Sequence, residues 1–335
     1  MSTIVAMPDH PLRVLVTKTL TLPVVTAEDE AMIAEAAGPG AQVTVVDRPK
    51  EGLPHAGDID VILGVVPPWI FDAAPDLRWV HATASGVDSF MYDDFVNSDV
   101  VLTGEKGLVG GHLADTAFAL LLGLTRRLAM AVELGPAGWT QENREKMRFS
   151  EVELEGLTMG IVGFGGTGRH IARRAVAFGM DVQAVDALPV EPSDGVSEVW
   201  GLDRLDDVVA TSDVLAVGLP LTDETRGMCD DEFFGRMKDT AIMLNVTRGE
   251  IIDGPSLERA LINGTIGGAA LDVAPVEPLP AESPLWSLDN CVMTPHTAGA
   301  SQLRGPRNMA RFRRNLHAMR EGRPMEGVVD KNAGF

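Results

Sequence analysis

Short apolar runs alternate with helical segments along the first hundred residues of the chain. The runs are rich in β-branched residues and are separated by turn-forming residues, a pattern typical of buried strands. The stretch Glu28–Ala37, between the first two runs, has helical character and ends at Gly38-Pro39. Such alternation predicts a parallel sheet covered by helices. The predicted strands are Arg13–Thr17, Val43–Val46, Val61–Val65, Trp79–His81 and Val100–Thr103.

The same alternation returns between Met159 and Thr294 and predicts a second, complete doubly wound unit. Proline in the first turn and Asn-Gly at the end support the last of its helices. The predicted helices are Arg169–Phe178, Leu205–Thr211, Asp230–Met237 and Pro255–Asn263. The predicted strands are Gly156–Val162, Asp181–Asp186, Val214–Leu219, Ala241–Asn245, Gly268–Leu271 and Val292–Thr294.

Three further segments flank this second unit in sequence, and a fourth lies within it. His112–Glu133 has apolar residues on most faces in its first half, which predicts one long helix serving as an interdomain element. Gly135–Arg148 is polar and irregular, and Leu188–Asp194 is rich in proline, so both are predicted to be loops. Arg304–Glu321 reads as a basic amphipathic helix, and we expect its arginines to form an interdomain salt-bridged face.

Composition limits the function. A chain of 335 residues is long for one core, so two domains are expected. The net charge of −20 argues against nucleic acid or an anionic membrane as a partner. The most apolar run, Ala117–Leu124, is far shorter than the roughly 20 residues of a membrane span, and the amino terminus lacks signal-peptide features, so we expect a cytoplasmic protein. Cys229 and Cys291 form neither a disulfide framework nor a metal cluster and are expected to be buried, inert thiols.

Gly163, Gly165 and Gly168 have the G-x-G-x-x-G spacing between a predicted strand and a predicted helix. The first glycine allows a tight turn, the second lets the backbone approach a pyrophosphate, and the third lets helix and strand pack closely. In a chain with 35 glycines the spacing alone fits a plain turn equally well, so the flanking elements decide. Asp186, 18 residues after Gly168, suits the hydroxyls of an adenosine ribose. The stretch predicts an NAD site, since Ala187–Pro192 holds no arginine for a 2′-phosphate.

Three short segments follow later strands of this unit and carry Arg248, Glu277 and His296. Strand-end loops of a doubly wound sheet share one edge, so these residues can converge despite their separation in sequence. Arginine binds a carboxylate through two parallel hydrogen bonds, histidine exchanges a proton near neutral pH, and glutamate orients the imidazole of that histidine. Each residue alone is explained as well by a surface ion pair, a loop acid or a core histidine. Ser85–Asp88, after the fourth strand of the first unit, is by its spacing alone a simple turn.

Taken together, these segments and their order resemble those of the D-isomer-specific 2-hydroxyacid dehydrogenases. The resemblance rests on ATASGVD, GHLADTAFALLLGLTRRL, the glycine loop, GLPLTDETRG, LNVTRGEIID, GGAALDVAPVEP and TPHTAGAS, in family order. It implies two doubly wound parallel-sheet domains, one flavodoxin-like for the substrate and one Rossmann-type for NAD, with the active site in a cleft between them. The substrate domain would comprise residues 1–108 and 300–335, and the NAD domain residues 109–299. It also implies a homodimer built around the cofactor domain.

The resemblance assigns roles residue by residue. Arg248, Glu277 and His296 match the catalytic arginine, glutamate and histidine, and the backbone of Gly86 and Val87 matches the site that holds the substrate carboxylate. Together with Gly163, Gly165 and Gly168, the positions that match cofactor contacts are Gly166, Thr167, Asp186, Pro220, Thr225, Val246, Thr247, Asp272, His296 and Gly299. Asp272 would orient the nicotinamide carboxamide.

The implied reaction is hydride transfer between NAD and a small 2-keto or D-2-hydroxy acid, as in a glyoxylate or hydroxypyruvate reductase. Two alternatives stay open. One is a non-catalytic NAD-sensing protein like the C-terminal binding proteins, which share this scaffold. The other is a formate or phosphite dehydrogenase, although formate enzymes carry Gln where Glu277 stands. Gly218 departs from the polar or aromatic residue common before Leu219-Pro220, and we expect it to widen the space near the cofactor.

Overall fold

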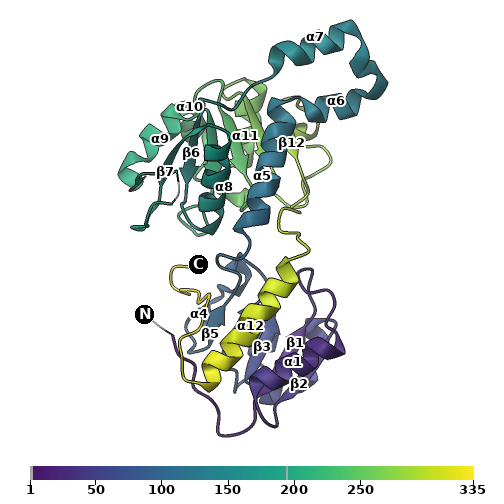
Figure 1. Ribbon diagram of the computed structural model, residues 1–335, viewed down its shortest axis with the longest axis vertical. Helices are drawn as coiled ribbons and strands as arrows, with labels where there is room; N and C mark the ends of the chain where they lie inside the picture. Colours follow the sequence, from purple (N-terminus) through teal and green to yellow (C-terminus); the bar gives the residue numbers. More distant parts are fainter. Residues whose placement is uncertain (1–2, 194) are drawn as a thin grey trace. The chain divides into compact units, whose positions relative to one another are not determined.

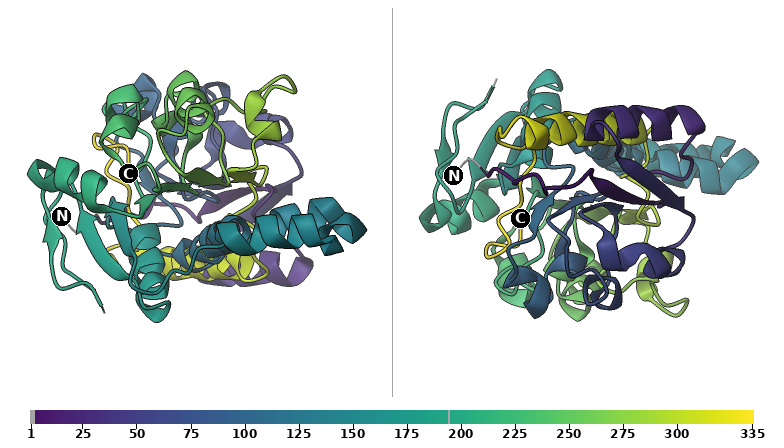
Figure 2. Two further views of the ribbon diagram at one scale, coloured as in Figure 1. Left: turned by 90° about the horizontal axis from the view of Figure 1, so that it is seen from above. Right: turned by 90° about the horizontal axis from the view of Figure 1, so that it is seen from below.

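The computed structural model describes residues 3–193 and 195–335. The chain separates into two compact units, Met1–Val109 with Ala300–Phe335 and, between them in sequence, Gly110–Gly299. Figures 1 and 2 show the ribbon of both units.

The first unit is a five-stranded parallel sheet in the order β2-β1-β3-β4-β5. This is the order of the flavodoxin-like fold. Side chains alternate along β1, so that Val14 and Val16 pack under α1 and α12 on one face, while Leu15 packs on the other. The elements are β1 Arg13–Thr17, α1 Ala27–Ala37, β2 Gln42–Val46, α2 Pro49–Gly52, η1 Leu53–Asp58, β3 Val61–Gly64, α3 Pro68–Phe71, β4 Trp79–Ala82, η2 Asp88–Phe90, α4 Asp93–Val96, β5 Val101–Thr103 and α12 Arg304–Arg320.

The second unit is a seven-stranded parallel sheet in the order β12-β11-β10-β9-β6-β7-β8. One face is covered by α5 and α8, and the other by α9, α10 and α11. The elements are α5 Gly110–Thr125, α6 Leu128–Leu134, η3 Gly135–Trp139, α7 Gln141–Ser150, β6 Thr158–Val162, α8 Gly166–Ala177, β7 Asp181–Val185, β8 Val199–Trp200, η4 Leu202–Arg204, α9 Leu205–Thr211, β9 Val214–Val217, α10 Asp231–Arg236, β10 Ile242–Asn245, η5 Gly249–Ile251, α11 Gly254–Ile262, β11 Gly268–Leu271, η6 Pro284–Ser287 and β12 Cys291–Met293.

The order of the second sheet places a topological switch between β6 and β9. The chain runs outward from β6 through β7 to β8 and then returns to β9 on the other side of β6. In open parallel sheets, ligands bind at such a switch, outside the carboxyl ends of the strands. The glycine turn after β6 and the loops after β9, β10, β11 and β12 all lie along this edge.

The predicted long helix His112–Glu133 is wrong, because the helix is broken into α5 and α6. Arg127 adopts φ +55°, a left-handed conformation that ends α5. Its guanidinium nitrogens donate to the carbonyl of Ser150, at 3.1 and 2.9 Å, at the end of α7. A tertiary hydrogen bond therefore compensates the break, and the local apolar pattern gives no sign of it.

The predicted surface loop Gly135–Arg148 is also wrong, because η3 and α7 occupy it. Thr140 caps α7 by accepting a hydrogen bond from the Asn143 amide at 3.3 Å. None of the residues of α7 is buried, so the helix has no apolar stripe to reveal it in the sequence. Figure 1 shows α6 and α7 extending from the sheet of their unit as a helical arm, residues 128–150.

Three arginines of α12, Arg304, Arg311 and Arg314, bind partners in their own unit. The expected interdomain salt-bridged face stays a prediction. Arg304 donates two hydrogen bonds to the buried carboxylate of Glu105, at 2.9 and 2.7 Å. Arg314 makes a similar pair with Glu326 and holds the pKa of that carboxyl below its ordinary value. Arg311 donates to the carbonyls of Gly104 and Lys106.

The predicted loop Leu188–Asp194 is confirmed for residues 188–193, which form no regular structure, while Asp194 lies outside the described residues. The sequence did not predict one short strand. The edge strand Val199–Trp200 has two residues, too few for a period-two pattern to reveal.

Candidate active site

The turn after β6 has the geometry that the glycine spacing predicts. Gly163 adopts φ +95°, a backbone conformation that residues with a Cβ rarely adopt. A Cβ on Gly168 would lie 2.2 Å from the Gly163 carbonyl oxygen, so this glycine allows α8 to pack against the turn. A Cβ on Gly165 would meet nothing within 4 Å, and Gly165 and Gly166 are exposed at the start of α8. The amides of this helix start, including that of Thr167, suit a pyrophosphate.

Asp186 lies beside this turn, directly after β7. One carboxylate oxygen accepts a hydrogen bond from the Phe164 amide at 2.7 Å, and the other accepts one from the Leu188 amide at 2.9 Å. The carboxylate is half-buried and is fixed to the glycine turn by the first of these bonds. A carboxylate held here suits the ribose hydroxyls of a dinucleotide.

Gly218 does not widen the site, and that expectation is wrong. It follows β9, and its amide donates to the Val162 carbonyl at 2.7 Å. A Cβ on Gly218 would lie 2.4 Å from the Gly163 carbonyl oxygen. The absence of a side chain therefore serves the close approach of β9 to the glycine turn and leaves no empty space.

The other predicted cofactor positions follow successive strands of the same sheet. After β9, the Thr225 hydroxyl donates to the Pro220 carbonyl at 2.8 Å and so closes a turn. After β10, Val246 is buried in the core, while Thr247 is half-buried and donates its amide to Asn245 Oδ1 at 2.9 Å. Gly299 is half-buried at the end of the unit.

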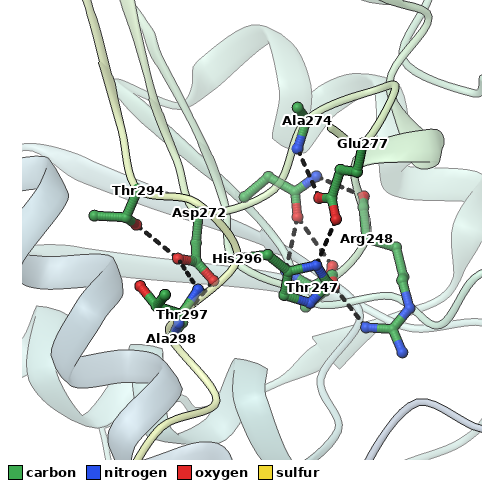
Figure 3. A network of polar contacts seen from close by, with 10 residues as sticks. Thr247, Arg248, Asp272, Ala274, Glu277, Thr294, His296, Thr297 and Ala298 are labelled. Carbon is green, nitrogen blue, oxygen red and sulfur yellow. Dashed lines mark hydrogen bonds and ion pairs between the residues drawn. The ribbon is translucent and has the colours of Figure 1, made fainter. Parts of the chain in front are cut away.

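Glu277 and His296 meet at this edge (Figure 3). Glu277 Oε2 lies 2.7 Å from His296 Nδ1, and Glu277 Oε1 accepts a hydrogen bond from the Ala274 amide at 3.0 Å. Both side chains are partly open to solvent, with 37% and 44% of their surface exposed. The backbone amide thus fixes the carboxylate, the carboxylate orients the ring, and Nε2 is the nitrogen turned away from Glu277.

Arg248 lies in the loop after β10, which packs directly against the loop that carries Glu277. A Cβ on the neighbouring Gly249 would lie 1.8 Å from the Ala274 carbonyl oxygen, so the two backbones touch. The Asn245 side-chain amide donates to the Arg248 carbonyl at 2.8 Å, and the Arg248 guanidinium donates to the Thr247 carbonyl at 2.9 Å. The structure thus brings three predicted residues from three strand-end loops to one edge (Figure 3).

Asp272 follows β11 and is 1% exposed. Its carboxylate accepts hydrogen bonds from the Thr294 hydroxyl at 2.6 Å and from the amides of Thr297 at 2.9 Å and Ala298 at 2.8 Å. Sequence reasoning missed this network, although two threonines flanking His296 and an acid after the preceding strand were visible in the sequence.

Gly86 and Val87 belong to the other unit. They lie in the loop after β4, at the carboxyl edge of the five-stranded sheet, with Gly86 half-buried and Val87 buried. The Val87 carbonyl accepts the Phe90 amide at 2.8 Å and begins the short helix η2.

Cys229 is buried and Cys291 half-buried, and both are free thiols. Burial raises the pKa of Cys229 well above its ordinary value and that of Cys291 to about 12, which keeps both thiols protonated and unreactive at neutral pH. Among the described residues, no group of three or more His, Cys, Asp or Glu side chains is placed to hold a metal ion. Within the same residues, no helix has the length and apolarity to cross a membrane.

Residues 118–298, more than half of the chain, match the family described as D-isomer specific 2-hydroxyacid dehydrogenase, NAD binding domain. The chain belongs to the D-isomer-specific 2-hydroxyacid dehydrogenase family. It is accordingly an oxidoreductase of 2-keto and 2-hydroxy acids, and the predictions of family, fold class and activity class are confirmed.

Individual members of the family are similar over most of the chain. A glyoxylate reductase of Korarchaeum cryptofilum is 35% identical over 265 residues, covering 78% of this chain and 79% of its own. The crystal structure of a family member from Aeromonas salmonicida is 29% identical, with a TM-score of 0.79 over 96% of this chain and all of its own. The NADPH-dependent glyoxylate/hydroxypyruvate reductase of Sinorhizobium meliloti, in complex with NADP and sulfate, is 27% identical, with a TM-score of 0.79 over 97% of this chain and all of its own.

Proposed function

We propose that the protein reduces glyoxylate, hydroxypyruvate or a similarly small 2-keto acid to the D-2-hydroxy acid, with NADH as the hydride donor. The observation that carries the proposal is the His296–Glu277 pair at 2.7 Å, held by the Ala274 amide, beside the loop of Arg248. The glyoxylate reductase of K. cryptofilum, similar over most of its length, supports the substrate class.

The pair suits proton transfer to a keto oxygen. With Nδ1 against the Glu277 carboxylate, His296 gives the proton from Nε2 in reduction and takes it back in oxidation. Glu277 contacts Nδ1 of the imidazole and keeps the ring in one orientation. Arg248 grips the carboxylate and keto oxygen of the substrate, and its position on a strand-end loop fixes that substrate against His296.

The residues around the glycine turn fit a dinucleotide. The open space at Gly165, the exposed start of α8 and the carboxylate of Asp186 offer places for a pyrophosphate and a ribose. A nicotinamide dinucleotide bound there would supply the hydride chemistry of the reaction. We propose NAD rather than NADP, because Asp186 would repel a 2′-phosphate and Ala187–Pro192 holds no arginine to attract one. The NADP complex of the S. meliloti relative makes this preference a necessary test.

The two units have different proposed roles, one in binding substrate and one in binding NAD. We propose that residues 1–108 with 300–335 form the substrate domain, in which the amides of Gly86 and Val87 hold the substrate carboxylate, and that residues 109–299 bind NAD. Gly166, Thr167, Pro220, Thr225, Val246, Thr247, Asp272 and Gly299 keep their proposed cofactor contacts.

We also propose a homodimer formed through the helical arm. The arm exposes large apolar side chains that its own unit does not cover: Leu128 at 59%, Val132 at 74%, Trp139 at 80% and Phe149 at 83% exposure. Large apolar side chains left exposed within one short segment are typical of a protein interface. Light scattering after gel filtration should give twice the mass of the 35.7 kDa chain, and Trp139→Ser with Phe149→Ser should halve it. A wild-type monomer at micromolar concentration would remove this part of the proposal.

The activity is tested by following NADH oxidation with glyoxylate, hydroxypyruvate and phenylpyruvate, each also with NADPH. We expect turnover with at least one of the two small acids, a smaller kcat/KM with phenylpyruvate, and a higher kcat/KM with NADH than with NADPH. Absence of turnover with all 2-keto acids, alongside tight NADH binding, would instead support a non-catalytic NAD-sensing protein.

A further inference from the structure

The segment Thr294–Ala298, which carries His296, has little regular structure of its own. The His296 amide donates to the carbonyls of Asp272 at 2.7 Å and Thr294 at 3.0 Å, and His296 adopts φ +53°. A histidine in the left-handed region holds that conformation only where its surroundings impose it. Something outside the segment must therefore fix the backbone that aims the imidazole.

Asp272 is placed to do this. All three donors to its carboxylate come from the segment Thr294–Ala298, two residues before His296 and one and two residues after it. Its own carbonyl accepts the His296 amide as well. Asp272 itself is fixed by its amide, which continues the ladder to the Asn245 carbonyl at 2.9 Å. One buried residue at the end of β11 thus binds the segment on both sides of His296 (Figure 3).

We infer that Thr294 and Asp272 form a latch that holds His296 in position for proton transfer, with Thr294 acting as a positioning residue. The Thr294 hydroxyl shares Asp272 Oδ1 with the Thr297 amide. A buried carboxylate needs its full set of donors, and an O–H bond to it at 2.6 Å is of the strong, charge-assisted kind. Without the hydroxyl, the carboxylate turns or shifts and the amides of Thr297 and Ala298 lose their fixed acceptor. The inference rests on the proposed role of His296.

The test uses Thr294 and leaves Asp272, a proposed cofactor contact, intact. Thr294→Val keeps the shape and removes the hydroxyl, while Thr294→Ser restores it. Thr125→Val is the control, because Thr125 is also buried and its hydroxyl donates only within its own helix, to the Leu121 carbonyl at 2.9 Å.

We expect Thr294→Val to lower kcat on the order of tenfold to a hundredfold, the cost of a catalytic group displaced by about 1 Å, with KM for NADH within about twofold of wild type. Thr294→Ser should restore most of kcat, and Thr125→Val should leave it unchanged. Hydrogen–deuterium exchange of a peptide covering residues 294–299 should be faster in Thr294→Val alone.

Unchanged kcat and unchanged exchange in Thr294→Val would overturn the latch, as would a loss of kcat that serine fails to restore. A wild-type protein without turnover would refute the proposed function, and the exchange experiment would then decide alone whether Thr294 and Asp272 hold the segment.

Discussion

Replacing Gly218 with alanine tests how the dinucleotide turn is built. The Gly163 carbonyl oxygen lies between two glycines, 2.4 Å from the Cβ position of Gly218 and 2.2 Å from that of Gly168. The obstacle is backbone on both sides, so no side chain can move aside. An ordinary contact needs about 3.5 Å, and Gly218→Ala therefore pushes the turn outward by about 1 Å.

We expect that displacement to weaken the binding of the dinucleotide. The amides at the start of α8 would move by a similar amount relative to the phosphates, enough to stretch hydrogen bonds of about 3 Å beyond their useful range. Loss of one or two such bonds raises the dissociation constant about tenfold to a hundredfold, or about 1.4 to 2.7 kcal/mol. Overpacking adds about 1 to 3 kcal/mol of lost stability.

The assay is calorimetric titration of NADH into wild type, Gly218→Ala and the control Gly235→Ala. Gly235 lies in α10, where a Cβ meets nothing within 4 Å, so alanine should leave affinity and stability intact. Circular dichroism confirms that each variant is folded at the titration temperature. A folded Gly218→Ala that binds NADH within twofold of wild type would refute the reasoning.

Three further predictions follow from single residues. Arg248→Ala should lower kcat/KM on the order of a hundredfold to a thousandfold while NADH binding persists, and retention of more than about a tenth of the wild-type kcat/KM would contradict its role. Asp186→Ala should narrow the preference for NADH over NADPH, measured as the ratio of kcat/KM, and an unchanged ratio would exclude Asp186 as its source. Burial lowers the pKa of His81 to about 3, so the unfolded chain binds a proton that the native state does not, and the free energy of unfolding should fall as pH drops below about 6.5, by up to about 1.4 kcal/mol per unit. Urea midpoints of wild type and His81→Asn between pH 7.5 and 5 check this, because the variant should show the shallower slope.

The sequence predicted the elements whose pattern is local. Strand β1 and the turn from Gly163 to Gly168 were readable because a buried strand, a glycine spacing and a helix follow one another directly. Loops that follow parallel strands share the carboxyl edge of the sheet, and this rule placed Arg248, Glu277 and His296 on that edge, where the structure has them. Their catalytic roles stay predictions.

What the sequence missed depends on contacts between distant segments. The break at Arg127 is stabilised by the Ser150 carbonyl, and α7 has no buried face to impose a period. Gly218 was misjudged because its neighbour, Gly163, lies 55 residues earlier in the chain and only the folded sheet brings them together.

The return of the chain's end to the first unit has a consequence for biosynthesis. The core of that unit includes Met309, Phe312 and Leu316 of α12, and Phe312 stacks on Trp79 of β4 with ring centroids 5.0 Å apart. These side chains leave the ribosome only after all of Gly110–Gly299 has been made. The unit Gly110–Gly299 has its whole sequence available while the N-terminal sheet still lacks α12, which together with α1 covers one of its faces. Domains usually complete folding in the order of synthesis, but here the unit begun first is finished last.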